Sequence, residues 1–165
     1  MPDDNPLIVD PGRFTGEGAE ISLLSFLRSA DTNLDTLKDD DITVAIQPLH
    51  TLILRILVPA DKVEPAKQLP KPGRPIRHLA ARILVKLHKK VESRSLFDVV
   101  QALLKAVDGG GRNMSALENV QRVACWYTIG EVINAHGANV SAQYRHLLPD
   151  SQSWVTHEPT FVDNC

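Results

Sequence analysis

Apolar residues recur along this chain at intervals of three and four, the spacing that places them on one face of an α-helix. The clearest pattern covers residues 75–91, where a proline stands at the first helical position and opens an apolar stripe. That stripe consists of Ile76, Leu79, Ala80, Ile83, Leu84, Leu87 and Val91. The same periodicity predicts helices over residues 19–37, 42–58, 95–107 and 115–136, with a short one over 138–148. The pattern therefore predicts an all-α chain.

Three details of these helices make sharper predictions. The first helix is expected to bury Ile21, Leu24, Leu27, Leu34 and Leu37. Pro48 falls inside the second, so that helix either kinks there or begins near Gln47. The fifth helix is apolar almost all round, which predicts that it is the most buried element.

The remaining segments divide the chain into three parts. Residues 1–18, with prolines, glycines and acids, are predicted to be a disordered acidic arm. Residues 19–148 form the helical repeat domain, in which the proline-rich stretch 59–73 is a connector. Residues 149–165 have no helical periodicity and are predicted to be an irregular tail.

Later helix starts recur at intervals of roughly 20 residues, which is typical of stacked helix pairs. We therefore expect a HEAT/armadillo-like α-solenoid of about five or six antiparallel helices. Such stacks serve as surfaces for other proteins more often than as enzymes. An end of such a stack that lacks its neighbour exposes an apolar flank, and the chain is accordingly expected to be a fragment of a longer solenoid.

The net charge of −2 conceals a strong asymmetry along the chain. Residues 1–41 hold ten acids against three bases, whereas residues 67–94 hold nine bases against Glu92 alone. The basic face of the third helix consists of Arg74, Arg77, Arg82, Lys86, Lys89 and Lys90. The two blocks either attract each other within the fold or each face a separate partner.

The basic face of residues 67–94 gives an alternative function, a helical module that binds nucleic acid or anionic lipid. No aromatic residues are interleaved with these bases, as stacking on single strands would require. The pattern therefore does not favour nucleic acid as a partner, and a solvated or neutralised helix face explains the charge more simply.

The sequence contains no constellation that predicts catalysis, cofactor binding or metal binding. No two of its six histidines are four residues apart, and Cys125 lies in an apolar helix without a nearby base. Glu118 and Glu131 would be separated by about 20 Å along one helix, too far for a catalytic pair. Gly109-Gly110-Gly111 is not followed by the Gly-Lys-Ser/Thr of a phosphate-binding loop. We therefore expect a protein that is not an enzyme and needs no cofactor.

Targeting signals are likewise missing from the pattern. No basic start followed by an apolar run and a cleavage site is visible, and only two cysteines are present. The longest apolar stretch, residues 51–58, is interrupted by Arg55 and far shorter than the ~20 residues of a spanning helix. These observations predict a cytoplasmic protein.

Four stretches of the chain carry a family resemblance. They are Leu23-Leu24-Ser25-Phe26-Leu27-Arg28, residues 73–87, Ser95-Leu96-Phe97-Asp98-Val99-Val100-Gln101 and residues 122–131. In their order and spacing they resemble the N-terminal end of the very large HEAT-repeat proteins that accompany the clathrin adaptor of the trans-Golgi network and endosomes.

This resemblance implies an α-solenoid scaffold in traffic between the trans-Golgi network and endosomes. It further implies clathrin-adaptor or coat accessory proteins as partners, a peripheral position on those membranes through the partners, and no catalysis. Two departures stand out. Family members run to many hundreds of residues, and the pattern is lost from Leu148 to Cys165, where their solenoid continues.

Overall fold

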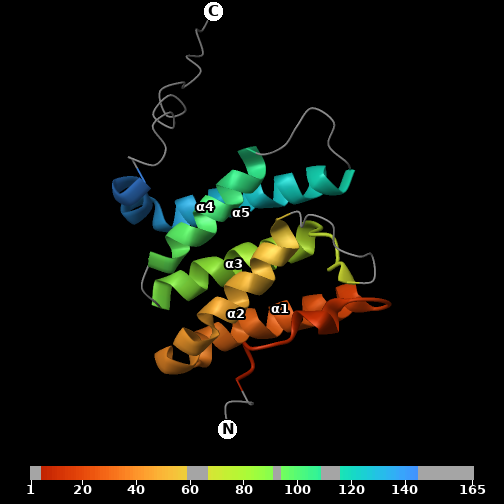
Figure 1. The fold of residues 1–165 in the computed structure, drawn as a ribbon. Helices are drawn as coiled ribbons and strands as arrows, with labels where there is room; N and C mark the ends of the chain where they lie inside the picture. Colours follow the sequence, from red (N-terminus) through yellow and green to blue (C-terminus); the bar gives the residue numbers. More distant parts are fainter. Residues whose placement is uncertain (1–4, 59–66, 91–93, 109–115, 145–165) are drawn as a thin grey trace, which may run out of the picture.

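The computed structural model describes residues 5–58, 67–90, 94–108 and 116–144, and within these ranges the protein is all-helical (Figure 1). Its helices are η2 (Pro11–Phe14, a 3-10 turn), α1 (Ala19–Thr36), α2 (Asp39–Leu57), α3 (Arg74–Lys90), α4 (Arg94–Asp108) and α5 (Ala116–Tyr144). The described residues include no strand. The all-α prediction is therefore confirmed.

The helix boundaries follow the apolar pattern with two refinements. α2 begins at Asp39 and continues through Pro48, so a start near Gln47 is wrong. Asp39, Asp40 and Asp41 occupy its first turn, where the positive end of the helix dipole stabilises their negative charges. α5 runs on to Tyr144 but leaves helical geometry at His136 (φ −120°, ψ 15°), the position where the fifth helix was expected to end.

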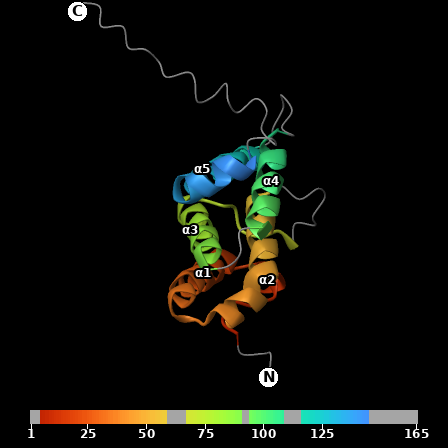
Figure 2. The ribbon, with the colours of Figure 1, turned by 90° about the vertical axis from the view of Figure 1, so that its left-hand side faces the viewer.

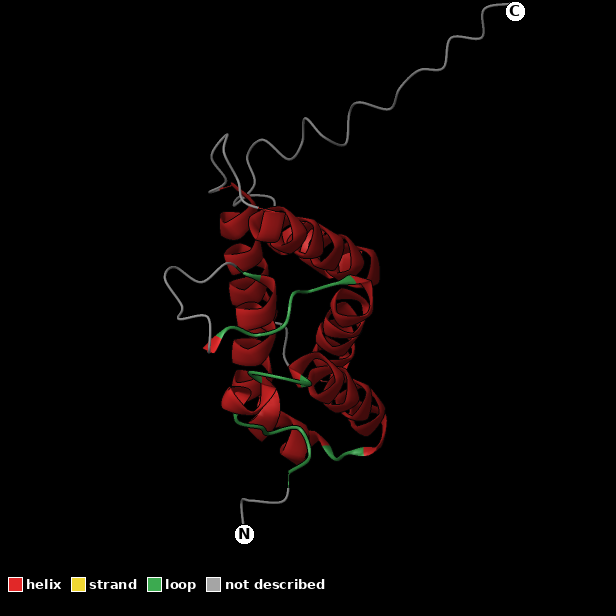
Figure 3. Cartoon of the chain, turned by 90° about the vertical axis from the view of Figure 1, so that its right-hand side faces the viewer, coloured by secondary structure: helices red, strands yellow, loops and turns green. Residues whose placement is uncertain are grey.

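Successive helices alternate between two layers. α1, α3 and α5 lie side by side in one layer, and α2 and α4 lie in the other (Figures 2 and 3). α3 is the middle element of its layer and packs most extensively against α1 and α5. The buried side chains of α2, α3 and α4 meet between the layers; they include Ile42, Leu49, Ile53, Ile56, Ile76, Ile83, Leu87, Val99, Val100 and Leu103.

The buried face of α1 differs in phase from the predicted one. Leu27 and Leu34 are buried as expected, but Ile21 is 76% exposed. The residues that face α3 and η2 instead follow the series Leu23, Leu27, Ala30 and Leu34, at spacings of four, three and four. Including Ile21 was wrong because it lies in the first turn, off the line of that series.

α5 is not the most buried element, contrary to the prediction. Its inner side is fully packed through Ala124, Cys125, Thr128, Ile129 and Val132. Val123, Trp126 and Ile133, in contrast, are 52%, 46% and 45% exposed. The reason is positional, since α5 lies at the end of its layer, where it packs mainly against α3 and α4 among the described helices (Figure 1).

The N-terminal arm is ordered from Asn5 onwards, so the prediction of a disordered arm over residues 1–18 is wrong for that part. Leu7 is fully buried, and Phe14 is 3% exposed with its ring 5.5 Å from that of Phe26. The burial of these two large apolar side chains holds the arm on the helices, and Phe14 packs η2 against α1. The Asp10 side chain caps η2 by accepting a hydrogen bond from the Gly12 N–H at 3.0 Å.

Several predicted segments lie outside the described residues. These are residues 1–4, the connector from 59 to 66, and the irregular tail of residues 149–165. Gly109-Gly110-Gly111 and the end of the short helix over 138–148 lie there too.

A buried histidine pair joins the two layers. His50 on α2 and His88 on α3 stack with ring centroids 5.1 Å apart, and their Nε2 atoms are 3.0 Å apart. One Nε2 must therefore donate a proton to the other. The buried Nδ1 of His88 has no partner among the described residues, and a bare acceptor is cheaper to bury there than an N–H. His88 is thus the donor, and His50 carries its own proton on Nδ1.

The pair is stable only while both rings are neutral. Burial lowers the pKa of His50 to about 4, against the weak opposing effect of Asp98. Burial, His50 and His136 together lower the pKa of His88 to about 3. Because the unfolded chain binds protons near pH 6.5 and the folded chain does not, acid shifts the equilibrium toward unfolding.

We predict that the protein loses stability as the pH falls below about 6.5. Between pH 7 and pH 5 the free energy of unfolding should drop by on the order of 2–4 kcal/mol, with little change above pH 7. Urea unfolding followed by circular dichroism at each pH measures this. The double variant His50→Leu/His88→Leu should lose most of the dependence, and an unchanged acid response in that variant would contradict the assignment.

Candidate interaction surfaces

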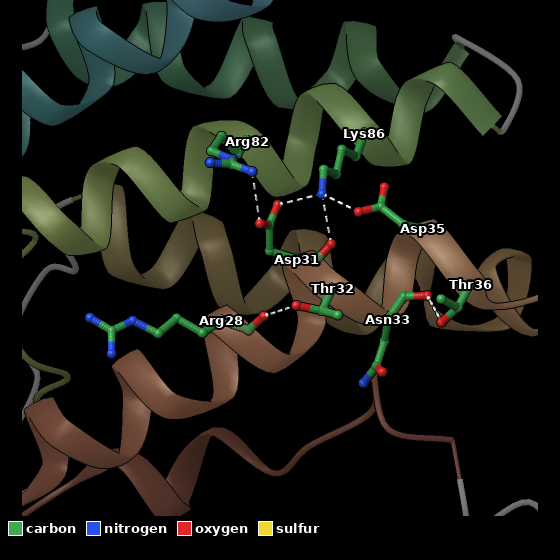
Figure 4. Close-up of polar contacts among 8 residues, drawn as sticks. All are labelled: Arg28, Asp31, Thr32, Asn33, Asp35, Thr36, Arg82 and Lys86. Carbon is green, nitrogen blue, oxygen red and sulfur yellow. Dashed lines mark hydrogen bonds and ion pairs between the residues drawn. The ribbon is translucent and has the colours of Figure 1, made fainter.

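An ion-pair cluster links α1 to α3 (Figure 4). Asp31, whose side chain is only 13% exposed, lies between the Arg82 guanidinium at 3.1 Å and Lys86 Nζ at 3.0 Å. Lys86 Nζ also donates hydrogen bonds to the backbone oxygen of Asp31 at 2.8 Å and to Asp35 Oδ2 at 2.7 Å. We call Asp31, Asp35, Arg82 and Lys86 the Asp31 cluster.

The charges in the Asp31 cluster stabilise one another. Partial burial alone would lower the pKa of Lys86, but the hydrogen bond to Asp35 and the charge of Asp31 raise it above its ordinary value. The hydrogen bond from Lys86 lowers the pKa of Asp35. Asp31 Oδ1 contacts Lys86 Nζ as an ion pair without accepting a hydrogen bond of good geometry. Here the acidic and basic blocks attract each other within the fold.

The other members of the basic face are spread around α3. Arg77 lies over the Tyr127 ring of α5, 5.6 Å from its centroid, and is half-buried. Arg74 and Lys89 are exposed, and Lys90 is half-buried near Asp35. Arg82 and Lys86 point toward α1 while Arg77 points toward α5, so the six predicted residues do not form one open patch.

A second polar contact joins α3 to α5 beside Arg77. The oxygen of Tyr127 is 2.6 Å from Nδ1 of His78. Burial and the neighbouring Glu131 carboxylate raise the pKa of Tyr127, so its hydroxyl keeps its proton. This contact fixes the relative position of the two helices.

Cys125 is held as a protonated thiol. Its Sγ donates to the backbone oxygen of Leu57 at 3.2 Å, and burial raises its pKa to about 12. A thiol in that state is a poor nucleophile. Within the described residues no three His, Cys, Asp or Glu side chains come together as a metal site. The side chain of Glu118, together with His146, His157 and Cys165, lies outside the described part.

Among the described residues, an exposed apolar strip runs along α5. It consists of Val123, Trp126 and Ile133 with the exposed Gly130 between them, and we call it the α5 strip. A Cβ placed on Gly130 would meet nothing within 4 Å, so the centre of the strip is open. The opposite end of the stack is different, because η2 packs against α1 there, with the buried Phe14 ring beside that of Phe26.

Sequence reasoning found the basic residues but missed Asp31 and the histidine pair. Asp31 follows the buried Ala30 directly, and His50 and His88 each occupy a position adjoining the apolar series of its helix. A polar residue on a helix's buried side is a signal that a partner is required. The spacing of histidines along one helix carries no information about a partner on another helix.

We predict that Lys86→Met lowers the free energy of unfolding by about 1 kcal/mol, because Asp31 loses one of its two cationic partners. Lys89→Met on the exposed side of α3 is the matched control and should change stability by less than about 0.5 kcal/mol. Thermal or urea unfolding of both variants measures the difference, which should shrink in high salt. Equal effects of the two substitutions would show that the Asp31 cluster does not stabilise the fold.

Comparisons with protein-family models, curated proteins and solved structures give no match for this chain. Among the described helices, none combines the length and apolar character needed to cross a bilayer. The function must therefore be argued from the fold, its surfaces and the sequence pattern.

Proposed function

We propose that the chain is a non-catalytic protein-interaction scaffold of the HEAT/armadillo-like α-solenoid type. The observation that carries the proposal is the alternation of successive helices between two layers, with α3 stacked between α1 and α5. Each added helix in such a stack contacts only its neighbours, and extended surfaces for partner proteins result.

The unlike ends of the stack give further support. Terminal repeats of solenoids carry a covering element on their outer side, as η2 with Phe14 does on α1. The α5 end has no such cover among the described residues, so the α5 strip is left exposed to a partner.

The cellular role that we propose is clathrin-adaptor-dependent traffic between the trans-Golgi network and endosomes. It rests on the sequence resemblance, whose stretches fall in α1, α4 and α5 and, apart from Gly73, in α3. The partners would be clathrin-adaptor or coat accessory proteins. The chain would then be cytoplasmic and held on those membranes through its partners.

No observation favours the alternative of a module that binds nucleic acid or anionic lipid. Such binding needs several cations directed at one set of phosphates. Arg82 and Lys86 instead face Asp31 and Asp35, and Arg77 faces Tyr127.

The proposed role predicts that the full chain, immobilised at its N-terminus, retains adaptor or coat proteins from cytosolic extract. Mass spectrometry identifies the retained proteins. A bait with Leu84→Asp, which places a charge in the core, is the control for non-specific capture by an unfolded chain. Retention of the same proteins by both baits, or of no adaptor or coat protein by the folded one, would contradict the role.

A separate binding experiment tests the alternative function, a module that binds nucleic acid or anionic lipid. Binding to RNA or to anionic vesicles that falls steeply with salt, and falls again in Arg74→Glu/Lys89→Glu, would favour a phosphate-binding module. These two positions are exposed, so the double variant should fold normally.

A further inference from the structure

The α5 strip has the spacing of a coiled-coil seam. Val123, Trp126, Gly130 and Ile133 follow one another at intervals of three, four and three residues. Alternating steps of three and four residues keep side chains on one line, where they fit between those of a facing helix. Three of the four are exposed large apolar residues, which are seldom aligned on an outer face by chance.

The strip is also symmetric along its own length. Trp126 and Gly130 lie at equal distances on either side of position 128, and so do Val123 and Ile133. Two copies of this helix placed antiparallel about that position bring Trp126 of each copy opposite Gly130 of the other. Val123 then meets Ile133 in both flanking layers. An arrangement in which one patch pairs with itself is the requirement for a two-fold interface.

We propose that the α5 strip binds a second copy of this chain in an antiparallel helix pair centred on position 128. The indole of Trp126 occupies the open space over Gly130 of the second copy, where a side chain would otherwise stand. Large-against-small pairing of this kind lets two helix backbones approach closely while the apolar surface is buried.

Charge favours a second copy as the occupant. The strip itself carries no charged residue, so self-association brings no like charges together along its centre. At the rim, Arg122 and Asn134 are also equidistant from position 128, and each would lie opposite the other. A cation therefore faces an amide instead of another cation.

The exposed area sets the strength of the contact. Three partly exposed apolar side chains and a glycine per copy amount to an interface of roughly 800 Å² or less in total, the range of weak complexes. We therefore infer a reversible dimer with a dissociation constant on the order of 100 μM, formed at high local concentration.

Sedimentation velocity of the full chain tests this proposal. From a few micromolar to about a millimolar, the weight-average mass should rise from 18.2 kDa toward twice that value. Trp126→Glu should abolish the rise. Ile21→Glu is the matched control, since it places the same charge at a more exposed apolar position on α1 and should leave the rise unchanged.

The variant Gly130→Leu distinguishes an effect on dimerisation from an effect on folding stability. The substitution adds a side chain where nothing stands in the monomer and replaces glycine with a better helix former. It should raise the melting temperature of the dilute protein and still weaken dimerisation at least tenfold, because the space for Trp126 is filled. A stabilised variant that dimerises as before would overturn the proposed pairing.

Cysteine cross-linking tests the antiparallel register. In a Cys165→Ser background, the double variant Val123→Cys/Ile133→Cys should form covalent dimers under mild oxidation, and each single variant should form few. Cross-linking of the single variants alone would indicate parallel pairing and overturn the proposal. A chain that stays monomeric at all concentrations would also overturn it, yet such a chain could still retain adaptor proteins, so the two proposals fail separately.

Discussion

The position of α3 between its neighbours is the constraint on which the rest of the structure depends. Its apolar stripe closes the core, and its two polar edges select the partners on either side. Lys86 and Arg82 meet Asp31 on α1, whereas Arg77 and His78 meet Tyr127 on α5. His88 reaches across to His50 on α2. Apolar burial supplies most of the stability, and these directional contacts determine which helix lies where.

Most of the helices could be predicted from the sequence because each carries a strong three-four periodicity over at least three turns. The all-α architecture and the break at His136 followed from that signal. The predictions failed where a few long-range contacts outweigh local composition. Leu7 and Phe14 order an arm that its acids and prolines predict to be flexible, and Ile21 lies off the line that α1 presents to the core. Periodicity predicts the spacing of the buried residues, but near a helix end it does not determine which residues lie on the buried side.

The basic residues were identifiable from the sequence, but their roles were not. Lys86 is 55 residues from Asp31, and no local pattern says that their side chains meet. The opposite charges of residues 1–41 and 67–94 allowed mutual neutralisation as one alternative. The Asp31 cluster is where this neutralisation occurs. The same limit applies to His50 and His88, which are 38 residues apart and become a pair only when two layers close on each other.

The α5 strip is where local sequence and the packing of the chain disagree. A helix that is apolar on every side is usually buried on every side, yet Val123, Trp126 and Ile133 remain open while the inner side of α5 is fully packed. Conflicts between a local pattern and its surroundings concentrate at functional sites, because selection for binding maintains a surface that folding alone would make polar. The α5 strip is uncharged and evenly spaced, with a glycine opposite the place that an indole would occupy. That regularity is the signature of a surface shaped to receive another helix.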